Sequence, residues 1–472
     1  MREGLGESLQ SIQKFDAPLE LTTSSLDALK AFSLGREQEL AGKYLESIPF
    51  YKRAVEIEPN FASAWLKLGI QHNNTNQPGL AAEYMEKAFA LRDRVSEYEK
   101  LRISFFYYNY GTGEMDKAIG TQELLKRSYP REHTGPGNLA TLNSRIGQFE
   151  KAVAEVQEAL RLNPNAFAWH SNLMALFIRL NRFAEAGEVV ERGMGQKLDG
   201  TNFHVGLYEI AFVRGDAAAM QQQLDWAKGR PDEYLAVDWQ TETAAFAGQY
   251  RLSQEFSRRA VDMATRGNAK EVAAQYAAEQ ALRSATFGRC QQAKVAAAQA
   301  LALERGRVSL TRGALALALC GEAGQAQSII EELEKRYPKD TLNNSLWLPM
   351  IRAAGNINRN DHSPAIQLLE AAKRYEPVAQ FWSQTLRGQA YLRQRAGTEA
   401  RAEFQNILDH RGYAPLSALY PLAHLGLARA AAMTGDAATA RTAYQNFLAL
   451  WKDADPDLPI LQEAKREYET LK

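Results

Sequence analysis

The stretch ESIPFYKRAVEIEPNFASAWLKLG, residues 46–69, spaces its small and large apolar residues at the intervals of an α-helix. Ser47 and Ala54 are seven positions apart, and after an intervening proline Trp65, Leu68 and Gly69 stand three and four positions apart. Such spacing puts each set on one helical face, and small residues let two helices approach closely. The stretch therefore predicts the second helix of one hairpin followed by the first helix of the next.

The same pattern recurs along the chain. The position of Ser47 has counterparts at gaps of 33 to 40 residues, many of them followed seven positions later by a second small residue. These counterparts are Ala81, Ala118, Ala152, Ala186, Met220, Ser253, Ala293, Ala326, Ala365, Ala400 and Ala440. A period near 34 with this pattern resembles the tetratricopeptide repeat, a helix–turn–helix unit. The resemblance implies an all-α, right-handed superhelical solenoid of about twelve such units with a C-terminal capping helix.

Turn residues and slips in the period divide the chain. Glycine or asparagine is expected to end the first helix of a unit at Gly147, Asn181, Gly215, Gly248, Gly288 and Gly435. Gaps of 39 or 40 residues predict longer loops near residues 266–268, 340–344 and 410–415. We expect an N-terminal extension over 1–25, the N-terminal half of the array over 26–265, its C-terminal half over 266–452, and a capping helix over 453–472. The slip at 266 is where we expect the solenoid to bend or divide.

Composition excludes several classes of protein. Lysine and arginine total 56, as do aspartate and glutamate, so a broad nucleic-acid surface is not expected. No apolar run approaches the ~20 residues of a membrane span, and we expect a cytoplasmic monomer. If a membrane span precedes the chain in a parent protein, the alternative is an extracytoplasmic location. Cys290 and Cys320 are interpreted as reduced core residues, and a disulfide is the alternative.

The sequence lacks the motifs of the common catalytic sites. It contains no GxxxxGK[ST], GxSxG, HRD, DFG or HExxH. Asp453, Asp455 and Asp457 resemble the start of a calcium loop, but leucine and alanine occupy the glycine and glutamate positions that such a loop requires. We expect no enzyme activity, no cofactor and no metal site in this chain.

The candidate functional surface is the concave face, lined by first-helix residues that do not pack within their own repeat. Aromatic, methionine and arginine side chains are common anchors of peptide recognition. By register, the candidates are Arg36, Tyr107, Tyr110, Phe212, Asp238, Glu242, Phe246, Trp347, Met350, Trp382, Gln389 and Arg429. The alternative is that many of them fill contacts between repeats. The expected partner is a protein or peptide segment.

Several stretches have a narrower resemblance. They include GESLQSIQKFDAPLELTTSSLDALKAFSLG at 6–35, ALRDRVSEYEKLRISFFYYNYGTGEMDKAI at 90–119, and AYQNFLALWKDADPDLPILQEAKREYETL at 443–471. Together they resemble the C-terminal repeat region of bacterial eukaryotic-type serine/threonine protein kinases; similar regions follow winged-helix transcriptional regulators. The resemblance implies a sensor or docking arm in signalling, with no catalytic residue to carry over. Because the likeness begins partway into the familiar opening, we expect a fragment or a split gene.

Overall fold

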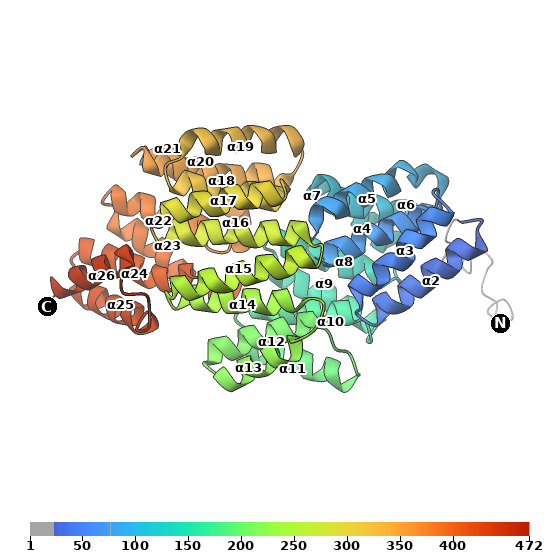
Figure 1. Cartoon of the computed structure of the whole chain (residues 1–472), viewed down its shortest axis with the longest axis horizontal. Coiled ribbons are helices and arrows are strands. Elements are labelled where there is room, and N and C mark those ends of the chain that lie inside the picture. The colour runs from blue at the N-terminus through green and yellow to red at the C-terminus, as the bar shows by residue number, and fades with distance from the viewer. Residues whose placement is uncertain (1–22, 76, 472) are drawn as a thin grey trace. The chain divides into compact units, whose positions relative to one another are not determined.

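The computed structural model describes residues 23–75 and 77–471, and every regular element among them is helical (Figure 1). The predicted all-α solenoid is thereby confirmed. Most of the predicted N-terminal extension lies outside the described residues. At its end, Ser25 caps α2 by accepting a hydrogen bond from the amide of Ala28.

The chain forms two compact units. The described part of the first unit runs from residue 23 to 176 and adds 188–200, whereas the second comprises 177–187 and 201–471. The first unit contains α2 Leu26–Leu40, α3 Tyr44–Ile57, α4 Ala62–Asn74, α5 Pro78–Ala90, α6 Glu97–Phe106, α7 Met115–Ser128, α8 Thr134–Arg145 and α9 Phe149–Leu162. The division passes through α10 Phe167–Arg179 and α11 Phe183–Gly195.

The second unit continues the series of helical hairpins. It contains α12 Thr201–Arg214, α13 Ala217–Ala227, α14 Glu233–Phe246, α15 Tyr250–Arg266, α16 Lys270–Thr286, α17 Cys290–Leu303, α18 Arg307–Leu319, α19 Ala323–Arg336, α20 Leu348–Asn358, α21 His362–Ala372, α22 Trp382–Arg393, α23 Gly397–Asp409, α24 Leu419–Met433, α25 Ala437–Leu450 and α26 Pro459–Glu469. The first helices of successive hairpins pack on one another in the order α16, α18, α20, α22, α24. They form an inner layer that the second helices cover.

The small residues of the repeat occupy helix crossings. In the α4–α5 hairpin, a Cβ added at Gly69 would stand 2.7 Å from Cγ of Met85. Ala81, Met85 and Ala88 are fully buried in the same apolar cluster. A larger residue at position 69 would push the two helices apart, which explains the small–large alternation of the sequence.

The predicted turn residues end the first helices as expected. Positive φ occurs at Gly147, Asn181, Gly215, Gly248, Gly288 and Gly435. Gly248 also meets a second requirement, because a Cβ there would stand 2.7 Å from the ring of Trp451. This position therefore needs glycine both for its backbone conformation and for close packing.

The prediction of a longer loop near 266–268 is wrong. Only residues 267–269 separate α15 from α16, and each of these helices has 17 residues where most second-unit helices have 11 to 14. The extra residues of this long repeat therefore extend its helices. Near 340–344 a π-helical turn, η4 Asn343–Trp347, takes up part of the insertion. Near 410–415 the longer connection is confirmed, with one short 3₁₀ turn, η6 Arg411–Tyr413.

The C-terminal segment folds back onto the second unit. The indole Nε1 of Trp451 donates to the carbonyl oxygen of Phe246 at 3.0 Å, and its ring meets Phe287 edge-on. The amide of Asp455 donates to the carbonyl of Gly248 at 3.1 Å. Helix α14 also contacts α24, so the second unit closes on itself.

Asp457 joins the C-terminal segment to two arginines of the second unit and does not cap α26. Leu458 precedes α26 without a side-chain cap, and Asp457 instead pairs with Arg251 at 2.8 Å and Arg289 at 2.6 Å. The acidic triplet that resembled a calcium loop thus contributes to this closure.

The interpretation of the cysteines as reduced core residues is wrong, because Cys290 and Cys320 form a disulfide. Cys290 begins α17 and Cys320 follows the last residue of α18. Stacking of consecutive hairpins brings their Cα atoms to 5.4 Å, within the range that a disulfide spans. The pairing was not apparent from the sequence because the cysteines lie 30 positions apart without a CxxC motif.

Candidate functional site

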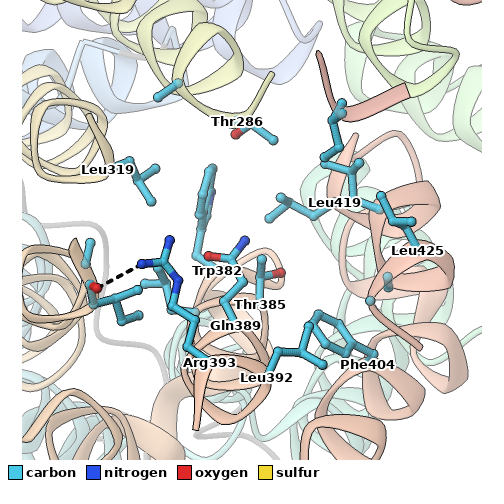
Figure 2. Close-up of a pocket in the computed structure, with 18 of the residues that line it drawn as sticks. Thr286, Leu319, Trp382, Thr385, Gln389, Leu392, Arg393, Phe404, Leu419 and Leu425 are labelled. Atoms are coloured by element: carbon cyan, nitrogen blue, oxygen red, sulfur yellow. Dashed lines mark hydrogen bonds between the residues drawn. The ribbon is translucent and has the colours of Figure 1, made fainter. Parts of the chain in front are cut away.

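A cavity of about 180 Å³ in the second unit brings together three predicted residues, Trp382, Gln389 and Arg429. Figure 2 shows Trp382 and Gln389 projecting from one helix toward the open space beside Leu319 and Leu419. The lining comes mainly from the inner helices α16, α18, α20, α22 and α24, with Phe404 from α23 and Ile460 from α26. It is the inner surface that the register predicted for these three residues.

The cavity has an apolar wall with a few polar groups at its edge. Its apolar lining includes Leu319, Ile357, Leu386, Leu392, Phe404, Leu419, Leu422 and Leu425. The hydroxyl of Thr385 is buried and makes no hydrogen bond. Arg393 donates to the carbonyl oxygen of Ile357 at 3.1 Å, which fixes one side of its guanidinium (Figure 2). This combination of apolar surface and few polar groups is typical of a ligand pocket.

Arg429 is held at the cavity edge by two carboxylates of α26. Its Nε donates to Glu467 at 2.9 Å, and its Nη2 lies 3.3 Å from Glu463. Burial disfavours the charge of Arg429, but the hydrogen bond and charge of Glu467 outweigh it and raise the pKa. The predicted terminal helix therefore positions a candidate binding residue.

A buried ion network fixes the helix that carries Trp382. Arg387 is 1% exposed and forms a two-bond pair with Glu403, at 2.7 and 2.6 Å. Its remaining amino group pairs with Glu376, which also accepts a hydrogen bond from Ser383 at 3.1 Å. Sequence reasoning did not identify this network, since its members fall at no repeated position.

Glycines on α22 and α24 bring these two helices close to Phe404. A Cβ at Gly388 would stand 2.8 Å from the ring of Phe404, and one at Gly426 would also collide with it. Because Phe404 also lines the cavity, the two glycines set the depth of its floor.

Two further predicted residues form an aromatic cluster. Phe212 and Phe246 meet edge-on with centroids 4.9 Å apart. The guanidinium of Arg411 lies 5.8 Å from Phe212, 5.7 Å from Phe246 and 5.0 Å from Tyr420. Burial lowers the pKa of Arg411. These two phenylalanines thus pack around Arg411, which lies in the connection 410–418 between α23 and α24.

Asp238 and Glu242 lie one helical turn apart on α14. Burial raises the pKa of Asp238 to about 6. Burial, together with repulsion from Asp238, raises the pKa of Glu242 to about 8. The nearby Arg283 only partly offsets both shifts.

Trp347 and Met350 have different environments. The guanidinium of Arg312 lies 3.6 Å from the ring centroid of Trp347, which is half-buried. Met350 is fully buried, so it packs in the core of its repeat.

The first unit holds Arg36, Tyr107 and Tyr110. Tyr107 stacks on Phe89 with centroids 3.9 Å apart. The guanidinium of Arg145 lies 5.0 Å from the ring of Tyr110. Arg36 is half-buried.

A family comparison identifies a repeat in part of the chain. A family profile described as tetratricopeptide repeat matches residues 137–166, which span most of α8 and α9. The solved TPR domain of P58(IPK) is 13% identical, covering 80% of this chain and 98% of that one with a TM-score of 0.24. MamA from Desulfovibrio magneticus RS-1 is 17% identical, covering 38% and 100% with a TM-score of 0.25. PilF from Pseudomonas aeruginosa is 18% identical, covering 43% and 90% with a TM-score of 0.28. No curated protein matches in sequence.

Proposed function

We propose that this chain is a non-catalytic docking module whose second unit binds a protein or peptide segment on its inner layer. The observation that carries this proposal is the cavity beside Trp382, where an aromatic ring, an exposed glutamine and an arginine surround an apolar floor. Pockets that bind whole small molecules usually have volumes of about 300–1,000 Å³. A space of about 180 Å³ suits one apolar side chain of a longer partner.

The surroundings of the cavity support a peptide anchor. Burying one apolar side chain stabilises a complex by roughly 1.5–3 kcal/mol. The unpaired hydroxyl of Thr385 and the amide of Gln389 offer hydrogen bonds to a peptide backbone. The network around Arg387 keeps α22 rigid, so little entropy is lost when a partner binds.

A phage-displayed dodecapeptide library panned against the whole chain tests this proposal. We expect the selected peptides to share an apolar residue and to lose at least about tenfold in affinity for the variant Gln389→Trp, whose new ring fills the cavity from an exposed position. Trp382→Ala should weaken the same peptides.

The matched control is Leu252→Ala, on the exposed side of α15. It should leave affinity unchanged. If Gln389→Trp and Trp382→Ala both kept every selected peptide bound, docking at this cavity would be wrong.

We also propose that the chain acts in bacterial signalling. This proposal rests on the resemblance of the sequence to the C-terminal repeat region of bacterial serine/threonine kinases. The alternatives are the C-terminal regulatory region of a serine/threonine kinase acting in cis, and the effector arm of a winged-helix regulator. An immunoblot of source cells with an antibody raised to this chain would distinguish these two alternatives from a free-standing adaptor. A band at the mass of this chain means an adaptor, whereas a band larger by a whole domain means an arm of a longer protein.

The disulfide is informative about the cellular compartment of the protein. Structural disulfides persist in oxidising compartments and are rare in the cytosol. Cys290 and Cys320 therefore favour the extracytoplasmic alternative over the cytoplasmic expectation. Within the described residues, none of the helices is long and apolar enough to cross a membrane.

A further inference from the structure

Asp238 and Glu242 form the core of an acidic cluster apart from the Trp382 cavity. Both lie on the inner helix α14, and Glu209 on α12 and Glu279 on α16 also influence the pKa of Glu242. Helices α12 and α14 share an apolar cluster that contains Trp239, and α14 and α16 share another that contains Tyr276.

The charges of this cluster do not balance. Glu279 pairs with Arg312 at 3.0 Å. Glu209 faces Arg179, whose positive charge lowers the glutamate's pKa against the larger effect of burial.

Two carboxylates, Asp238 and Glu242, then remain opposite one cation, Arg283. Arg283 donates to Gln280 at 3.1 Å, while its Nη2 has no hydrogen-bond partner. The inner surface of α14 therefore carries about one uncompensated negative charge when both carboxylates are ionised.

Unsatisfied polar atoms point to a missing partner at the same place. Oδ1 of Asp238 is buried without a hydrogen bond. The hydroxyl of Tyr276 is also unpaired, although the side chain is only 7% exposed. The ring of Tyr276 lies 6.3 Å from the ring of Tyr234, which precedes Asp238 by one turn of α14. Asp238 and Glu242 both raise the pKa of the Tyr276 hydroxyl. Buried polar groups are normally hydrogen-bonded, so each of these atoms calls for an explanation.

We infer that Asp238, Glu242 and the Tyr276 hydroxyl form an acceptor site for one cationic side chain, a lysine or arginine, of the docked peptide. This inference rests on the proposed docking function and names the chemistry of the partner. An ammonium or guanidinium group supplies the donors that these oxygens lack and neutralises the excess charge.

The same oxygens are poorly arranged for a metal ion. In the part of the chain that the structure describes, no three His, Cys, Asp or Glu side chains gather as metal ligands. A hydrogen-bond donor that carries positive charge fits two carboxylates and a phenol better.

The peptide library again supplies the probe. Peptides selected by the wild-type chain should share a lysine or arginine at a fixed distance from their apolar anchor. Replacing that cation by glutamine in a synthetic fluorescent copy should weaken binding by about tenfold or more. The double variant Asp238→Asn/Glu242→Gln should reduce the difference between the two peptides to less than about twofold.

A charge-matched control is available on the neighbouring helix. Glu255→Gln/Asp262→Asn removes the same charge from exposed positions of α15 and should leave the cation preference intact. Because Glu242→Gln removes a repulsion, the test variant is expected to fold, and circular dichroism would verify this.

Each outcome separates the inference from the proposal on which it rests. Peptides that bind through the Trp382 cavity without a shared cation would overturn the inference alone. So would a cation preference that survives in the Asp238→Asn/Glu242→Gln variant. If the wild-type chain selected no peptide at all, both the inference and the docking function would fall.

Discussion

At the scale of single residues, burial and local charge decide what each side chain contributes. Arg387 is enclosed, yet its guanidinium meets two glutamates and a backbone carbonyl, so its charge is fully compensated. Glu242 has no such compensation. Breaking a compensated buried pair is strongly destabilising, whereas removing an uncompensated carboxylate relieves the fold. Loss of the Arg387 charge should therefore destabilise the fold, whereas loss of the Glu242 charge should stabilise it.

The raised pKa values of three inner carboxylates predict that stability falls as pH rises. Glu242, Glu209 and Asp238 have folded pKa values of about 8, 7 and 6, above the ordinary values near 4. The folded state therefore binds more protons than the unfolded state between about pH 4 and 8, and stability is lost across that window. Asp238 on α14, Glu209 on α12, and Arg283 with Glu279 on α16 act electrostatically on Glu242.

Glu242→Gln should remove part of this slope. We expect it to stabilise the chain by roughly 1–2 kcal/mol at pH 8 and to have little effect near pH 4. Solvent screens part of the charge of this half-buried carboxylate, which limits the gain. Urea unfolding at both pH values measures this. Glu255→Gln is the exposed control, and an equal pH slope in wild type and Glu242→Gln would contradict the assignment.

At the scale of helices and hairpins, extra residues are absorbed without breaking the stack. One of the two 40-residue gaps lengthens α15 and α16, and the 39-residue gap forms the π-helical turn before α20. Only the slip after α23 produces an extended connection, and this connection delivers Arg411 to the aromatic cluster. Insertions that keep the small residues at the helix crossings leave neighbouring hairpins in contact.

The disulfide joins consecutive hairpins and should stabilise them against separation. Closing a loop of 30 residues predicts up to about 3–4 kcal/mol, so Cys290→Ser should lower the melting temperature and reductant should have the same effect on the wild type. In source cells, a maleimide reagent should label neither cysteine before reduction and both after it. Labelling without reduction would show that the thiols are free and would remove the argument for an oxidising compartment.

At the scale of the molecule, the second unit is held closed by residues far apart in sequence. Trp451 is 2% exposed and fits over Gly248, while Asp457 bridges Arg251 and Arg289. The indole accounts for most of the stabilisation, because exposed ion pairs contribute little to stability. This closure also positions α26, whose glutamates hold Arg429 at the candidate cavity.

Trp451→Ala should open this contact. We expect a loss of about 3–5 kcal/mol and a larger radius of gyration in X-ray scattering, since the C-terminal segment loses its anchor. Asp457→Asn is the comparison, with a much smaller loss. An unchanged radius and melting temperature for Trp451→Ala would show that the closure does not hold the second unit together.

The amino-acid sequence predicts the repeat, its helices and most of its turns without any knowledge of the fold. Helical periodicity, small residues at helix crossings and glycine or asparagine at turns are local signals that recur from repeat to repeat. It also placed Trp382, Gln389 and Arg429 on the inner layer, because their register follows from those helices.

Which of these residues contact one another depends on the packing of the hairpins in three dimensions. The cysteine pair, the ion network of Arg387 and the contact of Trp451 with the turn at Gly248 join positions that share no local pattern. Such contacts depend on how each hairpin rotates on the next, and small rotations accumulate along a solenoid. Periodicity fixes which face a residue occupies, whereas this accumulated rotation fixes what lies opposite it.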